Sequence, residues 1–514
     1  MRSLRARLQP FRGLLGVVVG AALAATVAST AYADDGASAT VTPTTEWDAV
    51  RARAKGLVDQ ADRRGGGLAA APLYERAGHL YMETFREACD APVRISEKPK
   101  LADPTKCDEV AFSAARAFAA AHLRAKALAT YRALLAFAQV SDTTTDLAAR
   151  AMREIALSYQ AIGIYDSAAE WHERYALDFP KDADAHLSLS DAAILRLGLS
   201  DEERALKDVD AYLKMYARSK PKETAAILLM IAIHHFEQGA NEKSRIAVTS
   251  RMELFDRAPI DIRIRAHALA AKVVPSHAKE EWAVVRRLWS DPRDAEQELR
   301  MAWKGEEDWR ADRRLAQVLT VVGDAIVAEA DEKRAAEVDS LRYPTFSRTN
   351  DVAGIEAFVT DEVKTWFVKK RAAIEPVEAA YVKALEVRPI PAPRAVIASA
   401  AGVGKMWAGL ADDLRSGPPG AAWRRDPKLL RLYVDAVGPL VDDVLRTRAK
   451  PTMKKCIELS VKLQFTDAPA HECEAWLVTT FPKEWHAVEE IVPGLRAGPR
   501  SMAVSPMPAW LDPL

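Results

Sequence analysis

The residues with the clearest chemical potential are four cysteines, which come in two close pairs. Cys89 lies near Cys107, and Cys456 lies near Cys473. The midpoint of the first pair falls in a Pro- and Lys-rich loop, and the midpoint of the second falls close to a turn predicted at 466–469. Residues at equal distances from a hairpin turn face each other, so each pair predicts a disulfide across a helical hairpin. Each bond would stabilise the fold by about 3 kcal/mol.

A zinc site is the alternative for the second pair, because His471 and Glu472 adjoin Cys473. A structural zinc ion needs four ligands, and this segment with Cys456 brings only three candidates together. The sequence therefore predicts no metal and no other cofactor.

Two other motifs suggest chemistry at first sight. Residues 401–406 read AGVGKM, but Ser399 stands where a phosphate-binding loop needs Gly, and Met406 replaces the magnesium-binding Ser or Thr. The small residues favour close packing of two helices instead. His234 and His235 lie in an apolar helix without an acidic residue at metal-binding spacing, which indicates half-buried structural histidines. Nucleophile and zinc-protease motifs do not occur, so we expect no catalytic residue and no enzyme.

Helices must position these residues. Ala, Leu, Arg, Glu and Lys dominate the composition, whereas strict alternation of Val, Ile and Thr is scarce. The 72 basic and 72 acidic residues balance, which gives no reason to expect nucleic acid as a partner. The leading fold class is all-α.

The most informative segment runs from 150 to 180 and reads RAMREIALSYQAIGIYDSAAEWHERYALDFP. Gly163 allows a tight turn between two helices, and Ala168 is small enough for the helices to approach. Pro180 ends the second helix, and Tyr159 is the fourth residue of the set. These four residues have the spacing of a tetratricopeptide repeat.

The same phase recurs along the chain. Ala127, Ala205 and Ser244 correspond to Ala168, at intervals of 41, 37 and 39 residues, and Gly198 and Gly239 are the expected turn residues of the later hairpins. The segment from about 105 to 260 thus resembles tetratricopeptide-repeat proteins, with intervals longer than the usual 34 residues. The resemblance implies a solenoid of helical hairpins whose concave face binds other proteins.

Beyond the repeats the chain stays helical. Trp282, Trp289, Trp303 and Trp309 fall in amphipathic helices and are expected to pack in the core rather than line a groove. Residues 343–350 predict a break, and the prolines of 388–393 predict an extended linker.

These features divide the chain into five regions. We expect a flexible leader and first helix, a repeat array, a Trp-rich helical segment and a C-terminal helical module to follow a signal peptide. The corresponding boundaries are 1–33, 34–70, 71–275, 276–350 and 351–514.

The C-terminal region, with AAYVKALEVRP, VIASAAGVGKMWAGLADDLRSGPPG, CIELSVKLQF and HECEAWLVTTFP, resembles the helical ends of envelope tetratricopeptide proteins of myxobacteria, some of them tied to gliding motility. This likeness implies assembly work in the periplasm or cell envelope.

The N-terminus predicts export. Arginines precede an apolar run from Leu14 to Ala28, and the small residues Ala31 and Ala33 frame a cleavage site after Ala33. The run is shorter than the roughly 20 residues of a membrane-spanning helix, and the mature chain has no other such segment.

We therefore expect an exported, non-enzymatic scaffold or adaptor that holds other proteins. The alternatives are an envelope hydrolase or transglycosylase whose site is not visible in the sequence, and a structural subunit of a motility or secretion complex.

Overall fold

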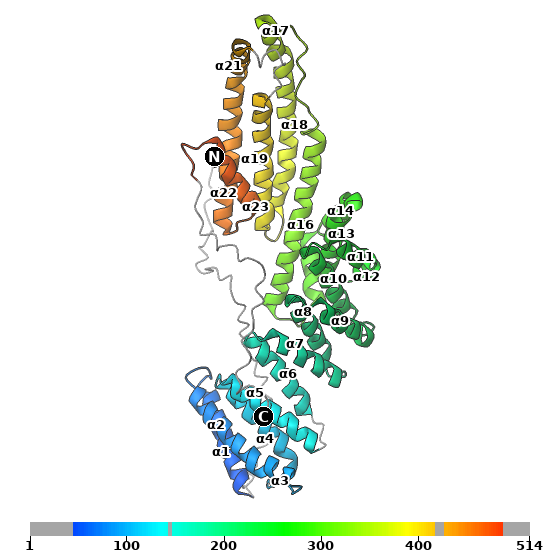
Figure 1. Ribbon diagram of the computed structural model, residues 1–514, viewed down its shortest axis with the longest axis vertical. Helices are drawn as coiled ribbons and strands as arrows, with labels where there is room; N and C mark the ends of the chain where they lie inside the picture. Colours follow the sequence, from blue (N-terminus) through cyan, green and yellow to red (C-terminus); the bar gives the residue numbers. More distant parts are fainter. Residues whose placement is uncertain (1–44, 142–145, 417–425, 487–514) are drawn as a thin grey trace. The chain divides into compact units, whose positions relative to one another are not determined.

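The computed structural model describes residues 45–141, 146–416 and 426–486, and the regular secondary structure in this part of the chain is helical apart from one isolated β-bridge between Lys304 and Glu306. The all-α prediction is confirmed. The signal peptide predicted at 1–33 lies outside the described residues. No helix among those described is long and apolar enough to cross a membrane. The chain divides into two compact units at Arg218 and Ser219, which we describe separately (Figure 1).

The first unit is a succession of helical hairpins. Its helical elements are α1 (Glu46–Arg63), α2 (Ala71–Thr84), η1 (Phe85–Asp90), α3 (Ala91–Arg94), η2 (Pro104–Lys106), α4 (Cys107–Ala120), α5 (Arg124–Val140), α6 (Asp146–Ala161), α7 (Tyr165–Asp178), α8 (Ala185–Gly198) and α9 (Glu202–Tyr216). Neighbours along the chain pair as α1 with α2, α4 with α5, α6 with α7 and α8 with α9. Successive hairpins stack, because α2 packs on α4, α5 on α6, and α7 on α8.

Each repeat hairpin turns through a residue in the left-handed backbone region. His122, Gly163, Ser200 and Gly239 have φ angles of 60°, 78°, 64° and 73°. In each case the N–H of the next residue reaches back to a carbonyl five residues earlier, as from Ile164 to Tyr159 at 3.0 Å. These hydrogen bonds at the turn satisfy the last carbonyl groups of the first helix. The turn residues follow the 41, 37 and 39 intervals predicted for the repeat.

The small residues of the repeat lie where the sequence predicts them. Ala127, Ala168, Ala205 and Ser244 are all fully buried, and Ser244 donates a hydrogen bond of 2.7 Å to the carbonyl oxygen of Ala232. One expectation was wrong: Gly198 is the last residue of α8, and Ser200 supplies the turn instead.

The first cysteine pair holds an insertion between α2 and α4. The helix of α2 widens into the π-helical turn η1, which carries Cys89, and Pro92 follows two residues after η1 ends. The Sγ atoms of Cys89 and Cys107 are 2.02 Å apart. The predicted loop at 91–104 is partly helical, since α3 occupies its first four residues.

The second unit begins with one more hairpin and continues as packed helices. Its helical elements are α10 (Pro221–Glu237), α11 (Asn241–Thr249), α12 (Met252–Asp256), α13 (Ile260–Val273), η3 (Pro275–His277), α14 (Ala278–Leu288), α15 (Pro292–Ala302), α16 (Asp308–Glu337), α17 (Val352–Ala357), η4 (Phe358–Val363), α18 (Lys364–Val382), η5 (Lys383–Glu386), α19 (Pro393–Ser416), α21 (Pro427–Val444), η6 (Leu445–Ala449), α22 (Lys450–Leu463) and α23 (Ala468–Thr480). Non-helical residues around 343–350 and 387–392 confirm the predicted break and linker.

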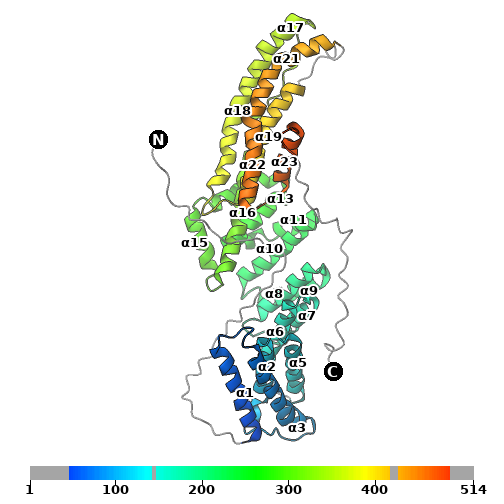
Figure 2. The same ribbon diagram turned by 90° about the vertical axis from the view of Figure 1, so that its left-hand side faces the viewer.

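The helix α19 is the centre of the C-terminal bundle, where it packs on α16, α18, α21, α22 and α23 (Figure 2). Its glycines permit close approach, because a Cβ atom at Gly402 would lie 2.7 Å from the ring of Tyr381. At Gly404 it would lie 2.7 Å from the sulfur of Met453. The AGVGKM segment is thus continuous helix that packs against its neighbours, as predicted, and forms no phosphate-binding loop.

The tryptophans of the 276–350 segment differ in exposure. Trp289 and Trp303 are buried, with 5% and 6% of their surface exposed, and Trp282 packs against the same core. Trp309 is 47% exposed and departs from the core-packing expectation.

Candidate functional site

The first helices of three consecutive hairpins share one exposed face. Repeat-equivalent residues occur 41 and then 37 positions apart, so Arg116, Leu157 and Ile194 occupy one repeat position. Because the hairpins share one geometry, equivalent positions point to the same side of the stack. Exposed or half-buried side chains mark this side in α4, α6 and α8. We define the α4–α6–α8 face by Arg116, Arg150, Arg153, Leu157, Leu187 and Ile194.

Half of the α4–α6–α8 face is basic. On α6, Arg150 and Arg153 follow one another at helical spacing, and Arg116 lies on α4, which packs directly against α6. Arg153 forms an ion pair of 2.8 Å with Asp184 while its side chain stays 42% exposed. An exposed pair of this kind contributes about 1 kcal/mol at most, so an acidic ligand can compete for Arg153.

A half-buried carboxylate lies at the base of the basic half. Burial raises the pKa of Glu154, and the charges of Arg153, Arg116 and Arg124 oppose this rise. Burial also raises the pKa of the nearby Tyr131, whose hydroxyl group is buried without a hydrogen-bond partner. The charges of Arg116, Arg124 and Arg153 therefore all act on Glu154, and three positive charges exceed the two negative charges of Glu154 and Asp184.

The other half of the α4–α6–α8 face is apolar. Leu187 and Ile194 lie two turns apart on α8, and their side chains are 47% and 43% exposed. Leu157 on α6 is half-buried. It occupies the same repeat position as Ile194 on α8 and Arg116 on α4. Exposed aliphatic residues beside a charged row are typical of a surface that binds a polypeptide.

The repeat residues predicted from sequence serve the core. Tyr131 and Tyr159 are 1% and 0% exposed, so neither lies on the open face. The helix α7 ends at Asp178, and the exposed Pro180 follows two residues later. His172 is 1% exposed and both of its ring nitrogens lack a hydrogen-bond partner. Burial lowers the pKa of His172 to about 4.

The second cysteine pair is also brought together. The Sγ atoms of Cys456 and Cys473 are 2.23 Å apart, across the turn between α22 and α23. Glu472 forms an ion pair with Lys405 rather than joining Cys473. In the part of the chain that the structure describes, no three His, Cys, Asp or Glu residues are grouped to hold a metal ion.

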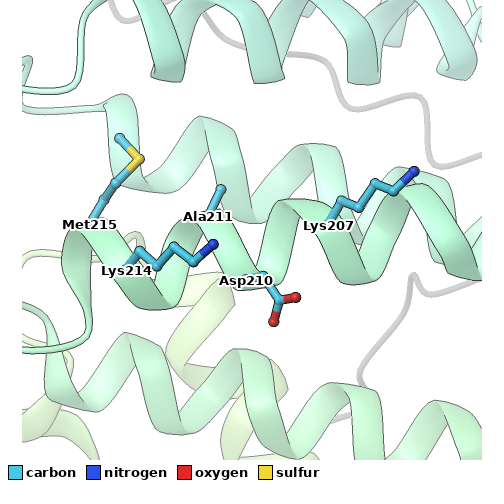
Figure 3. Close-up of a pocket in the computed structure, with 5 residues that line it drawn as sticks. All are labelled: Lys207, Asp210, Ala211, Lys214 and Met215. Atoms are coloured by element: carbon cyan, nitrogen blue, oxygen red, sulfur yellow. The ribbon is translucent and has the colours of Figure 1, made fainter.

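A shallow hollow of about 370 Å³ lies on α9, the second helix of the α8/α9 hairpin. Figure 3 shows that its lining residues, Lys207, Asp210, Ala211, Lys214 and Met215, come from α9 alone. Such a one-sided surface cannot enclose a substrate, and its only acid, Asp210, is exposed. The hollow has no arrangement for catalysis.

The α4–α6–α8 face is not among the sites predicted from the sequence, although the signal for it is present there. The intervals that align Ala127, Ala168 and Ala205 also align Arg116, Leu157 and Ile194. Sequence alone could not separate open positions from core positions in these degenerate repeats, whereas burial in the structure separates them.

No protein-family model matches the chain, and no curated protein matches it. Among solved structures, the chain is similar to one in the structure of Naa15/Naa10 bound to HypK-THB, with 12% identity and a TM-score of 0.30. This match covers 85% of the present chain and 66% of the other.

Two further solved structures are similar to the chain at the same distant level. One is a circular tandem repeat protein with novel repeat topology, which is 14% identical over 85% of this chain and 86% of that one, with a TM-score of 0.18. The other is a monomeric mutant of IFIT1 with m7Gppp-AAAA, which is 11% identical over 84% and 82%, with a TM-score of 0.20. Likeness at these values carries no functional information.

The internal geometry of the chain defines the class of protein, which these distant similarities do not. Four hairpins with the same turn, a buried Ala or Ser at the same repeat position and regular intervals make this an all-α chain with a TPR-like helical array. A helical module follows the array in the second unit.

Proposed function

We propose that the protein is a non-enzymatic scaffold or adaptor whose α4–α6–α8 face captures an extended acidic segment of another protein. The observation that carries this proposal is the convergence of Arg116, Arg124 and Arg153 around Glu154, beside the exposed Leu187 and Ile194. Carboxylates of the partner would pair with the arginines, and its apolar side chains would cover the α8 residues. A rigid helical stack loses little entropy when it binds.

Location in the periplasm or cell envelope, following export and cleavage after Ala33, is part of this proposal. The two close cysteine pairs support it, because disulfides form and persist in oxidising compartments. We propose that Cys89 bonds Cys107 and that Cys456 bonds Cys473. The C-terminal resemblance to myxobacterial envelope proteins agrees with this location.

Affinity purification with a charge-reversal variant tests the proposal. The tagged full chain and the Arg116→Glu/Arg150→Glu variant are used to purify partners from envelope extracts of the producing cells. We expect a partner that the wild-type chain recovers and the variant loses. The matched control Arg174→Glu changes an exposed arginine on α7, away from the α4–α6–α8 face, and should recover the partner. Equal recovery by all three chains would contradict the proposed face.

The hydrolase or transglycosylase alternative requires an acid held in a cleft. Burial raises the pKa of Asp208 to about 7, but this carboxyl is enclosed with Arg196 in the interior of a hairpin. Glu154 is the acid of the α4–α6–α8 face whose pKa burial raises. It lies at the base of an open face among arginines, and opposite charge favours its ionised form over the acid form that protonates a leaving group. The structure therefore favours binding over hydrolysis, and unchanged partner recovery by Glu154→Gln would agree.

A further inference from the structure

A second hollow, in the C-terminal bundle, has a composition that the scaffold function leaves unexplained. It measures about 240 Å³ and lies where α19, α22 and α23 pack together. Its floor and walls are Ala408, Gly409, Met453, Cys473 and Trp476, and its rim is Lys405, Asp412 and Glu472. Ligand pockets for small molecules begin at about 300 Å³, so this hollow has room for a single long side chain.

Gly409 is the first sign that the hollow has a function. Glycine inside a helix costs about 1 kcal/mol relative to alanine, and close packing accounts for the glycines at 402 and 404. Gly409 has no such reason, because a Cβ atom built there would meet nothing within 4 Å. A side chain at 409 would instead project into the hollow.

The ring of Trp476 is the second sign. In the same unit, the guanidinium group of Arg314 lies 3.7 Å from the ring centroid of Trp303, and that of Arg448 lies 5.2 Å from the ring centroid of Trp407. Trp476 contacts Phe481 edge-on at 5.8 Å. Among the residues that the structure describes, no cationic group lies over the Trp476 ring, and Trp476 lines the hollow.

The charge of the rim is the third sign. Lys405 pairs with Glu472 across the end of the hollow, and these two charges cancel. Asp412 is exposed and has no ion-pair partner among the described residues. Asp412 is therefore the rim carboxylate left without an ion pair. Burial raises the pKa of Asp412, while the charge of Arg415, one turn further along α19, favours its ionised form.

From these observations we propose that the hollow between α19 and α23 binds an arginine side chain of a partner polypeptide. The planar guanidinium group would stack on Trp476 and donate two parallel hydrogen bonds to Asp412. Its methylene groups would lie over Gly409 and Ala408. A lysine ammonium group would stack on the ring and pair with Asp412 less well, since it is neither planar nor able to donate two parallel hydrogen bonds.

The test is a titration of the full chain with blocked tripeptides. The indole N–H resonance of Trp476, assigned through Trp476→Phe, is followed by NMR while the peptide Ala-Arg-Ala is added. We expect a saturable shift, with weaker binding of Ala-Lys-Ala and none of the citrulline peptide, which has the shape of arginine without its charge. Equal binding of the lysine or citrulline peptide would overturn the assignment to arginine.

Three variants locate the binding. Gly409→Leu should abolish the shift because its side chain fills the hollow, and a thermal melt checks that the bundle still folds. Asp412→Asn should weaken binding about fivefold, the upper end for an exposed ion pair. The control Asp442→Asn, on α21 and outside the hollow, should bind as the wild type does. Unchanged binding by Gly409→Leu would also overturn the proposal. The α4–α6–α8 face is not involved, so this result is independent of the acidic-segment proposal.

Discussion

The hairpins α6/α7 and α8/α9 share one backbone conformation but bury different side chains. Tyr159 in α6 corresponds to Arg196 in α8, 37 residues later. Tyr159 is fully buried and accepts a hydrogen bond from Arg132, whereas Arg196 is 2% exposed and binds two carboxylates. An aromatic ring and an ion network therefore fill the same repeat position.

The ion network is tightly connected. One guanidinium nitrogen of Arg196 lies 2.6 Å from both carboxylate oxygens of Asp208, and the other lies 2.6 Å from Glu173. Burial alone would lower the pKa of Arg196, but the hydrogen bond to Glu173 and the charge of Asp208 outweigh burial, and the pKa is raised. A large side chain fills this repeat position in both hairpins, and a hydrogen bond reaches its polar end in each.

The largest expected effect comes from breaking this network. Arg196→Met should destabilise the α8/α9 hairpin by about 3 to 5 kcal/mol. Burial already raises the pKa of Asp208 to about 7, so without Arg196 this carboxyl must take up a proton or keep a buried charge without a partner. Tyr159→Phe in the other hairpin should lose only one hydrogen bond, about 1 kcal/mol. Hydrogen exchange of α8 and α9 within the full chain measures the local loss.

A double variant provides the control. Arg196→Met/Asp208→Leu removes both charges and should recover most of the lost stability. A double variant as unstable as Arg196→Met would mean that shape, and not charge, decides this position.

The next largest effect is a difference in the pH dependence of stability between the α6/α7 and α8/α9 hairpins. The pKa of His172 is about 4 in the folded chain, against about 6.5 in an unfolded chain. The unfolded state thus binds more protons between these values, so the stability due to neutral His172 is complete above pH 6.5 and falls as the pH drops toward 4. The full loss is about 3 kcal/mol.

Val209 is the α9 residue that corresponds to His172, and it does not titrate. We expect acid to loosen α6/α7 selectively, and His172→Phe to remove this pH dependence. Exchange rates in α7 at pH 7.5 and 4.5, corrected for intrinsic exchange, provide the measurement. The exposed His79→Gln serves as control, and an unchanged pH dependence in His172→Phe would refute the assignment.

The smallest effect concerns the turns. Ser200→Gly should stabilise the α8/α9 hairpin by about 1 kcal/mol, since Ser200 has a φ angle of 64° that glycine adopts without strain. Gly163→Ala should cost a similar amount at 78° in the α6/α7 hairpin. Urea unfolding of both variants measures whether each substitution raises or lowers the free energy of unfolding. Two changes of the same sign would rule out backbone strain as the cause.

The sequence predicts the repeat well because its signals are local. Turn residues and small residues act over a few positions, so Ala168 and Gly163 mark a hairpin without knowledge of the rest. The α4–α6–α8 face and the network of Arg196 depend on side chains from three helices, and no local pattern reports them. The turn at Ser200 was misplaced to Gly198 because glycine is the commoner, though not the required, left-handed residue.

The π-helical turns have a consequence for the cysteines. In the continuous helix from α21 through η6 to α22, Pro451 follows two residues after η6, just as Pro92 follows η1. A wider turn holds one extra residue and tolerates the missing N–H of proline, and it rotates all later side chains by about 100°. The direction in which Cys456 points is therefore set upstream of it. Excision of a single residue from 445–449 would swing its sulfur away from α23, and the covalent link would be lost although neither cysteine had changed.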